Sequence, residues 1–407
     1  MLDIKFIREN PKLVAEKSKQ KGYDVDVEKL LKVDEDRRKL IEEVDQLRSD
    51  RKKAADARDE KKGQQIKSQL KQKEDKLEKL HEEFYFLIRQ TPNLPKGDVK
   101  VGKDESENEV VRTVGKIPKF NFKPKDHLDL SQSLDLLDTE RATKVSGARF
   151  NFIKNELALL EFALANFAFD TLKKEGFIPV IPPVLINKKV VDGLGYPEYE
   201  SGEGYKVDDQ YLVGTAEHSI VPMHMDETLK DSDLPKRYVG FSTAFRREAG
   251  SYGKDTRGMF RVHQFDKVEM VSFVMPQDED KELEYLVSLE EKLVQQLELP
   301  YRVIKQCTAD LGFPTARKFD IEVWIPSEER YRETHSASLN TDFQSRRLNI
   351  KYERKGQREF LSILNATAIA MSRMPIAILE NYQQKDGSIL VPKVLQKYTS
   401  FTKIPKD

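Results

Sequence analysis

The chain has 407 residues and carries 70 lysine and arginine residues against 70 aspartate and glutamate residues, so its formal net charge is zero. This balance excludes a uniformly basic nucleic-acid coat but leaves a local basic surface open. The single cysteine, Cys307, excludes an internal disulfide and a cysteine-based zinc cluster.

The N-terminus and the apolar segments give no sign of export or membrane insertion. A charged residue, Asp3, already stands at the third position, and the longest apolar stretch, residues 157–169, contains Glu161. That stretch is too short for a bilayer, which needs about 20 residues. The sequence therefore predicts a soluble, cytoplasmic protein with no membrane partner.

Residues 27–91 predict two long helices. Helix-forming residues dominate, proline is absent, and a seam recurs at alternating steps of three and four residues, which is typical of a heptad pattern. The seam comprises Leu30, Val33, Arg37, Leu40, Val44, Leu47, Arg51 and Ala54, then Ile66, Leu70, Lys73, Leu77, Leu80, Phe84 and Leu87. A polar stretch, residues 56–65, separates the halves, with Gly63 as its only strong breaker. The pattern predicts an antiparallel coiled-coil hairpin with helices of roughly 40 Å.

The tip of this hairpin is basic. Residues 48–62 contain seven basic and four acidic side chains, a net charge of +3, and further lysines follow. A charged rod of this kind can reach a polyanion far from the main body of a protein. A solvated charged face is the alternative interpretation, because charge runs on coiled coils are commonly just that.

The rest of the chain predicts an α+β architecture. Residues 2–26 indicate a small helical lead-in, and residues 96–145 indicate an irregular linker and entry segment. Beyond residue 146, apolar helices at 157–174 and 280–297 alternate with β-rich runs at 238–245 and 260–274. This mixture favours an antiparallel sheet flanked by helices. We expect a helical arm over residues 1–110 and an α+β domain over residues 111–407.

Residues 242–269 indicate a β-hairpin suited to an elongated ligand. Side chains alternate along a strand, so Phe265 and Glu269 share a face, roughly 13 Å apart. That span fits an aromatic base at one end and an ammonium group at the other. Arg246 could lie between them and pair with a phosphate or carboxylate. Glycines in the loop 249–259 suggest close approach of the backbone to an anion. The alternative is an ordinary hairpin with surface ion pairs.

Several segments together resemble the seryl-tRNA synthetase family of class II aminoacyl-tRNA synthetases. The segments Phe245-Arg-Arg-Glu-Ala-Gly-Ser and Arg261-Val-His-Gln-Phe-Asp-Lys-Val-Glu269 are similar to that class's second signature motif. Residues 176–183 resemble the first motif, which lies at a homodimer interface in this family. The heptads fit the family's tRNA-binding arm, and the resemblance implies that residues 111–407 form its catalytic aminoacylation domain. Further resemblance lies in residues 215–217, 318–326, 342–350 and 377–383, so it covers essentially the whole chain.

The resemblance implies a role for each matching position. The residues implied for L-serine binding are Thr215, Ala216, Glu217, Arg246, Glu269, Asn365 and Thr367. Those implied for ATP binding are Arg246, Arg247, Glu248, Val262, Phe265, Glu333, Thr334, His335, Ser336 and Arg373. Arg246 and Arg373 are implied to be catalytic, and Glu333 and Ser336 are implied to hold Mg²⁺.

The implied reaction needs no protein nucleophile. The serine carboxylate attacks the α-phosphorus of ATP, and the resulting seryl-adenylate is transferred to the 3′ end of tRNA(Ser). A tRNA(Sec) acceptor is left open, and no DNA partner is expected. Positioning and charge neutralisation would supply the catalysis. Hydrogen bonds to the substrate hydroxyl could reject alanine by roughly 10⁴-fold.

Some positions depart from the family pattern, namely Ala337, Leu339, Ala366, Ser372 and Pro375. They cluster in sequence around the expected ATP and serine pocket, and a proline inside a helix costs about 3 kcal/mol unless the helix starts near it. These departures motivate a second hypothesis, a non-catalytic RNA-binding homologue. A third, a ligase that loads amino acids onto a carrier protein, conflicts with the arm, which such relatives lack.

Overall fold

The computed structural model describes residues 1–196, 202–248 and 258–405, and the chain divides into two compact units, Met1–Leu94 and Pro95–Asp407. The division lies earlier than the boundary at residue 110 that the sequence suggested. Residues just after Pro95 belong to the second unit because they bond to it: Lys96 N donates to Ala316 O at 2.9 Å, and Asp98 pairs with Arg317 and with Lys305 at 2.7 Å.

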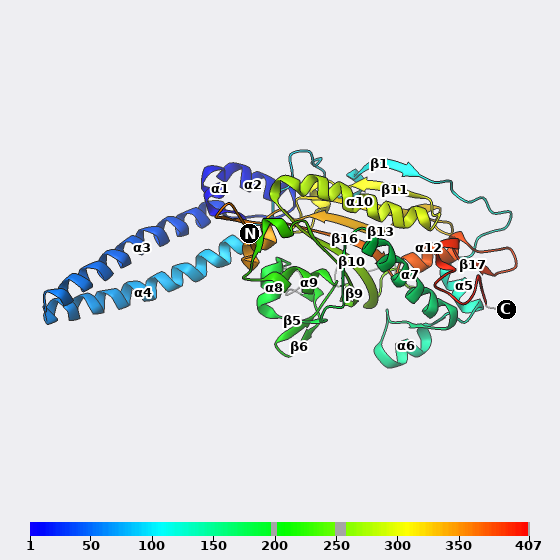
Figure 1. Ribbon diagram of the computed structural model, residues 1–407, viewed down its shortest axis with the longest axis horizontal. Helices are drawn as coiled ribbons and strands as arrows, with labels where there is room; N and C mark the ends of the chain where they lie inside the picture. Colours follow the sequence, from blue (N-terminus) through cyan, green and yellow to red (C-terminus); the bar gives the residue numbers. More distant parts are fainter. Residues whose placement is uncertain (197–201, 249–257, 406–407) are drawn as a thin grey trace. The chain divides into compact units, whose positions relative to one another are not determined.

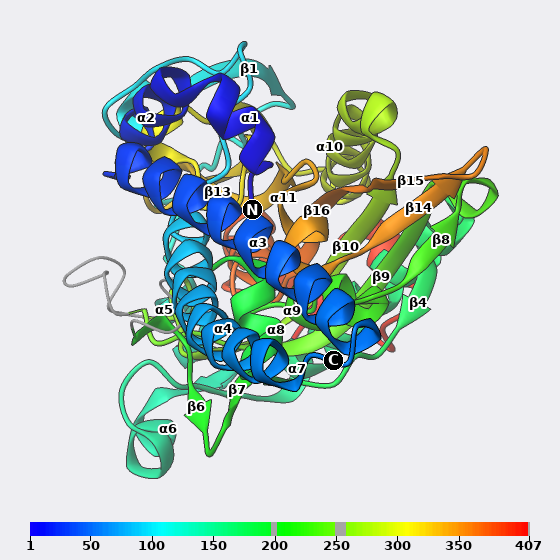
Figure 2. The same ribbon diagram turned by 90° about the vertical axis from the view of Figure 1, so that its left-hand side faces the viewer.

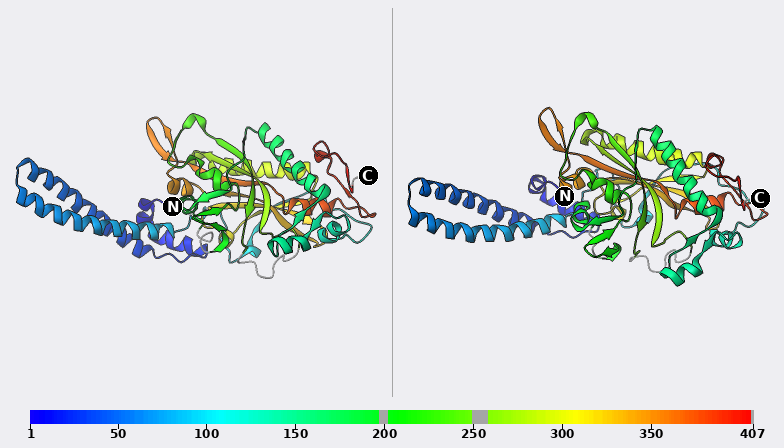
Figure 3. Two further views of the ribbon diagram at one scale, coloured as in Figure 1. Left: turned by 90° about the horizontal axis from the view of Figure 1, so that it is seen from below. Right: turned by 60° about the horizontal axis from the view of Figure 1, so that its bottom comes forward.

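The first unit is helical (Figure 1). Its described helices are α1 (Ile4–Glu9), α2 (Pro11–Gln20), α3 (Val27–Asp56) and α4 (Glu60–Arg89). Figures 1 and 3 show α3 and α4 running side by side, as the heptads predicted. The turn between them falls at residues 57–59 rather than at Gly63, which lies inside α4. Arg58 takes a positive φ of 57°, and the Asp59 carboxylate accepts a hydrogen bond from Lys62 N at 3.0 Å, so the cap starts the second helix early.

The seam of the hairpin is largely apolar, and two of its charged members, Arg37 and Lys73, are paired. Its buried apolar residues are Leu30, Val33, Leu40, Val44, Ala54, Ile66, Leu70, Phe84 and Leu87. Arg37 donates to Asp34 at 3.0 Å and lies 4.2 Å from the centre of the Phe84 ring, and Lys73 pairs with Glu43. Asp34, only 1% exposed, also pairs with Arg8 at 2.7 Å and so fastens α1 to α3.

An eight-stranded sheet forms the centre of the second unit. In spatial order its strands are β1 (Glu109–Val114), β11 (Tyr301–Lys305), β12 (Arg317–Ile325), β13 (Arg330–Leu339), β16 (Ser362–Ala370), β10 (Gln264–Val274), β9 (Lys236–Phe245) and β4 (Ile178–Val180). The neighbours pair antiparallel, except that β4 runs parallel to β9. The predicted α+β fold with an antiparallel sheet is confirmed.

Helices and small sheets surround this sheet. The helices are α5 (His127–Ser133), α6 (Thr139–Ser146), α7 (Asn155–Lys174), α8 (Lys188–Leu194), α9 (Glu217–Ile220), α10 (Glu279–Gln296), α11 (Phe343–Leu348) and α12 (Met374–Asn381). One three-stranded sheet contains β8 (Thr228–Lys230), β14 (Lys351–Arg354) and β15 (Gln357–Phe360), and another contains β5 (Leu185–Asn187), β6 (Lys206–Val207) and β7 (Gln210–Leu212). Two strand pairs complete the set: β2 (Leu137–Asp138) with β3 (Phe152–Ile153), and β17 (Ile389–Leu390) with β18 (Lys403–Ile404). Figure 2 shows β8, β14 and β15 together. Within the described residues, no helix combines the length and apolar character that a bilayer crossing demands.

The large sheet is covered on both faces. On one face, α7 and α10 pack against side chains such as Met270 and Ile321. On the other, α8, α9 and α11 pack against Val271, Phe273 and Ile363. Because neighbouring residues of a strand point to opposite faces, Met270 and Val271 belong to different cores. The face that carries Val271 also carries the candidate site, further along the same strands.

The expectation of an irregular segment over residues 96–145 is wrong in part. This segment contains β1, α5 and most of α6. The strand β1 escaped notice because it is an edge strand whose residues are almost all exposed, so it lacks the apolar alternation that marks a half-buried strand. Its pairing with β11, and not its own pattern, defines it.

Candidate functional site

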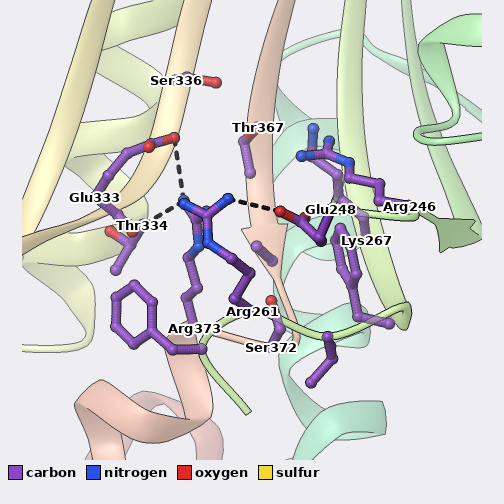
Figure 4. Close-up of a pocket in the computed structure, with 14 residues that line it drawn as sticks. Arg246, Glu248, Arg261, Lys267, Glu333, Thr334, Ser336, Thr367, Ser372 and Arg373 are labelled. Carbon is purple, nitrogen blue, oxygen red and sulfur yellow. Dashed lines mark hydrogen bonds and ion pairs between the residues drawn. The ribbon is translucent and has the colours of Figure 1, made fainter. Parts of the chain in front are cut away.

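A cavity of about 460 Å³, including its open mouth, lies over the middle strands of the large sheet. Strands β10, β13 and β16, the start of α12, the residues that follow β9 and the segment 260–262 all contribute to its wall (Figure 4). The lining residues are Arg246, Glu248, Phe260, Arg261, Val262, Phe265, Lys267, Glu333, Thr334, Ser336, Thr367, Ala370, Ser372 and Arg373. Elements far apart in sequence therefore converge on a strongly charged pocket.

Arg246 and Phe265 lie at one side of this cavity. Ala244 pairs with Phe265 across β9 and β10, and Arg246 follows two residues later. The guanidinium carbon of Arg246 lies 5.4 Å from the centre of the Phe265 ring, and its Nε donates to Gly214 O at 3.2 Å. The guanidinium is thus held in place through one nitrogen next to an aromatic face. An aromatic ring beside a fixed cation can accept a base and a phosphate.

Two further arginines, Arg261 and Arg373, line the cavity, and each pairs with a carboxylate. Arg261 donates to Glu248 at 2.6 Å, and Arg373 pairs with Glu333 at 3.1 Å and donates to the backbone oxygen of Glu333 at 3.2 Å (Figure 4). Desolvation raises the pKa of Glu333, but the charges of Arg373, Lys318 and Arg246 outweigh it and lower that pKa to about 2. Glu333 is therefore a carboxylate throughout the neutral range.

A buried ion pair between Lys267 and Glu269 adjoins the cavity. Lys267 Nζ lies 2.5 Å from Glu269 Oε2 and donates to Thr215 Oγ1 at 3.4 Å. Glu269 is 1% exposed and sits opposite Thr367 in the pairing of β10 with β16. Arg246 and Phe265 line the cavity, and Glu269 lies behind its wall, in contact with the lining residue Lys267.

Glu217 extends this buried group at the start of α9. Its Oε1 accepts hydrogen bonds from Tyr196 Oη at 2.9 Å and from Gln344 Nε2 at 3.2 Å. Burial and the nearby Glu269 raise the pKa of Glu217 to about 7, against the effect of those hydrogen bonds. Ala216 is fully buried beside Gly240, where an added Cβ would lie 3.2 Å from the Ala216 Cβ.

Nine of the predicted site residues line the cavity, and seven do not. Thr215, Ala216, Glu217 and Glu269 belong to the buried group beside it, whereas Arg247, His335 and Asn365 lie elsewhere. Arg247 stacks on Tyr205, with 4.9 Å from its guanidinium carbon to the ring centre. His335 pairs in register with Ile321 and so points to the α10 face of the sheet, where burial lowers its pKa to about 3. Asn365 is buried on β16 beside Ser338, two residues from Thr367.

The departures from the family pattern do not damage the cavity. Ala337, Leu339 and Ala366 are fully buried in the core under α7 and α10, on the face away from the site. Pro375 lies in the first turn of α12, where the helix needs no N–H from it. Only Ser372 lines the cavity. The expectation that the departures cluster around the ATP and serine pocket is therefore wrong for Leu339, because strand alternation turns its side chain away from the cavity.

Part of the predicted hairpin lies outside the described residues, including Gly250 and Gly253. Of its three glycines, Gly258 is described and has a φ of +79°. Conversely, the sequence reasoning did not select Lys267, Phe260 or Arg261 as site residues. Lys267 could have been found, because it stands between Phe265 and Glu269 on the same strand face. Nothing local in the sequence marked Tyr196 or Gln344.

Comparison with known proteins agrees with this geometry. Residues 1–95 match the seryl-tRNA synthetase N-terminal domain, and residues 203–382 match the tRNA synthetase class II core domain (G, H, P, S and T). A serine–tRNA ligase of Dictyoglomus thermophilum is 45% identical over 99% of both chains. The chain belongs to the seryl-tRNA synthetase family.

Solved structures of the family have the same fold. The seryl-tRNA synthetase of Pyrococcus horikoshii, complexed with ATP, superposes with a TM-score of 0.93 at 40% identity, over 99% of both chains. The cytoplasmic serine–tRNA ligase of Naegleria fowleri, in complex with AMP, superposes with a TM-score of 0.88 at 34% identity, over 98% of this chain and 97% of that one. Membership of the family thus extends over both compact units.

Proposed function

We propose that the chain is a serine–tRNA ligase that activates L-serine with ATP and transfers the seryl group to the 3′ end of tRNA(Ser), in the cytoplasm. The observation that carries this proposal is the convergence of Arg246, Phe265 and Arg373 on one cavity that adjoins the buried Glu269 carboxylate. Whether tRNA(Sec) is a further acceptor is a matter for a charging assay with that RNA.

The first step joins serine to the nucleotide. The serine carboxylate attacks the α-phosphorus, the bond from that phosphorus to the bridging oxygen breaks, and pyrophosphate leaves. Arg246 neutralises charge on the α-phosphate and the serine carboxylate, Phe265 stacks on the adenine, and Arg373 neutralises the remaining phosphates. These cations are fixed before reaction, which is how preorganised charge lowers a barrier.

Glu333 and Ser336 suit a Mg²⁺ ion that accompanies the nucleotide. Both belong to β13 and line the cavity, and they offer a carboxylate and a hydroxyl oxygen, the hard ligands that Mg²⁺ prefers. The low pKa of Glu333 keeps that carboxylate ionised and able to bind a cation. A magnesium ion held there supplies charge neutralisation for the phosphate oxygens.

The amino-acid end is formed by Thr215, Glu217, Glu269, Asn365 and Thr367. Glu269 accepts the serine ammonium, and neighbouring hydroxyl and amide groups pair with the serine hydroxyl. A site with polar groups that need such a partner rejects alanine, because alanine leaves them unpaired. Threonine is excluded by the space that its extra methyl group requires.

The second step uses the arm. A ribose hydroxyl of the terminal tRNA adenosine attacks the adenylate carbonyl, and AMP leaves. We assign the RNA contact to the exposed basic residues near the tip of α3 and α4, where Arg51, Lys52, Lys61 and Lys62 face solvent. Phosphate contacts of this kind weaken as the salt concentration rises.

We also propose that the protein is a homodimer. A cavity on α7 and β4 is apolar, and around it Phe162 is 64% exposed and Ile181 is 85% exposed. A second copy would cover this surface, which contains part of the segment 176–183. Size-exclusion chromatography with light scattering tests the assignment: Ile181→Asp should yield a monomer, whereas a monomeric wild type would refute it.

Pyrophosphate exchange tests the proposed function. Purified protein, ATP and labelled pyrophosphate should exchange label when serine is added, and should respond much less to threonine or alanine. Charging of tRNA(Ser) transcripts then tests the second step. Absence of serine-dependent exchange would refute the catalytic assignment.

A further inference from the structure

Lys267 has an unusual position in the site. It lines the cavity, whereas its ion-pair partner Glu269 does not, and both residues are buried. The two share a strand face because they are two residues apart on β10. The Lys267 ammonium therefore occupies space against the carboxylate that an incoming substrate ammonium also needs.

Burial alone would not leave Glu269 charged. Desolvation raises the pKa of Glu269, and the charges of Lys267 and Arg246 oppose that effect. Desolvation likewise lowers the pKa of Lys267, and Glu269 opposes that effect. An isolated buried carboxyl takes up a proton rather than staying ionised. The Lys267 ammonium, 2.5 Å from Glu269 Oε2, is the contact that favours the charged form of Glu269.

The surroundings add few competing charges. The titratable and charged groups that act on the pair from neighbouring elements are Arg246, Glu217, His218, Glu290 and His335. Burial lowers the pKa of both histidines to about 3, so they are neutral. Burial raises the pKa of Glu290 well above its usual value, which favours its neutral form. Lys267, 2.5 Å from Glu269 Oε2, is the positive charge that forms an ion pair with Glu269.

We propose that Lys267 is a positioning residue for the amino-acid end of the site: it holds Glu269 as a carboxylate, so that the site takes an α-amino acid as its zwitterion and rejects the corresponding hydroxy acid. This inference rests on the proposed function. On binding, the substrate ammonium shares Glu269, and Lys267 keeps its hydrogen bond to Thr215 Oγ1 as an alternative partner. No covalent step is involved.

The test measures serine KM and kcat by pyrophosphate exchange between pH 6 and 9. Lys267→Met should raise the serine KM at pH 7 at least tenfold and change kcat less than threefold. The acid limb of kcat/KM should move to higher pH, because Glu269 then has to lose its proton before it can bind the ammonium. L-Glycerate is the hydroxy acid that matches serine. The concentration ratio of L-glycerate to serine that inhibits exchange should be lower for the variant than for the wild type.

A double-mutant cycle separates positioning from general damage. In a Glu269→Gln background, Lys267→Met should add less than a threefold further change, because Lys267 acts through the carboxylate. Lys267→Arg should restore the wild-type pH profile, and Lys281→Met, at an exposed lysine of α10, is the matched control. If Lys267→Met does not fold, as judged by circular dichroism, Lys267→Gln replaces it.

Three results would overturn the inference: a serine KM within twofold of wild type, an unmoved pH profile, or a full effect of Lys267→Met in the Glu269→Gln background. Failure of the proposed function has a different signature. It would appear in the unmodified chain as absent exchange, whereas failure of the Lys267 inference appears only in variants of an active parent.

Discussion

Glu161 on α7 provides a quantitative test of how the stability of the second compact unit, Pro95–Asp407, depends on pH. Burial, together with the nearby Asp266, raises the pKa of this carboxyl from 4.5 to about 8, and its Oε1 has no hydrogen-bond partner within the described residues. The folded state therefore binds a proton that the unfolded chain releases above pH 4.5. Stability from this group is fully present below pH 4.5 and is lost as the pH rises toward 8.

The size of the effect follows from the two pKa values. At pH 7 the raised pKa of Glu161 lowers the free energy of unfolding by about 3 kcal/mol, since one pKa unit corresponds to 1.36 kcal/mol. Residual solvent contact of this half-buried side chain reduces the expected value to about 2 kcal/mol. Glu161→Gln cannot ionise, so it should be more stable than wild type at pH 8 and should lose that advantage at pH 5.

Urea denaturation at pH 5, 6, 7 and 8 provides the assay. Trp324, the only tryptophan in the sequence, lies on β12, so its fluorescence reports the unfolding of the second compact unit. Glu284→Gln, the same change at an exposed position of α10, should leave the difference from wild type independent of pH. The reasoning fails if the stability difference between Glu161→Gln and wild type is the same at pH 5 and pH 8.

Three further predictions concern the site and the arm. Arg246→Ala should slow adenylate formation by about 3 kcal/mol or more, which is more than a hundredfold in pyrophosphate exchange; activity within a few-fold of wild type would remove Arg246 from the mechanism. Replacing residues 50–72 with a short glycine–serine turn should spare exchange but impair tRNA charging, and unchanged charging at moderate salt would contradict the RNA assignment. Gly258→Ala should lower activity or stability, because its φ is +79° and the new Cβ would lie 2.1 Å from His127 Nε2. Wild-type melting temperature and exchange rate in this variant would contradict the prediction.

The sequence predicted those features that have a local period. Heptad spacing indicated α3 and α4, and alternation along β10 placed Phe265 and Glu269 on one face. The family resemblance added Arg373 and Glu333, which no spacing connects to Arg246. Their convergence depends on strand order, which is set by pairings between residues far apart in the chain.

Other features depend on tertiary context that no short window contains. The role of β1 arises from its pairing with β11, and the buried position of Leu339 follows from the face that β13 presents to α7 and α10. The pairing of Lys267 with Glu269 was accessible from alternation alone. It was missed because a lysine in a strand is more often assigned to solvent than to a buried pair.

One strand carries both of the residues that we propose to contact the adenine and the serine ammonium. Phe265 and Glu269 belong to β10, so their separation is set by the covalent repeat of an extended chain rather than by how well two domains dock. Substitutions that loosen the surrounding core should therefore melt the fold before they misalign the reactants. A single-residue insertion between these two positions should abolish activity in a protein that still folds, since it would turn one recognition end toward the opposite side of the sheet.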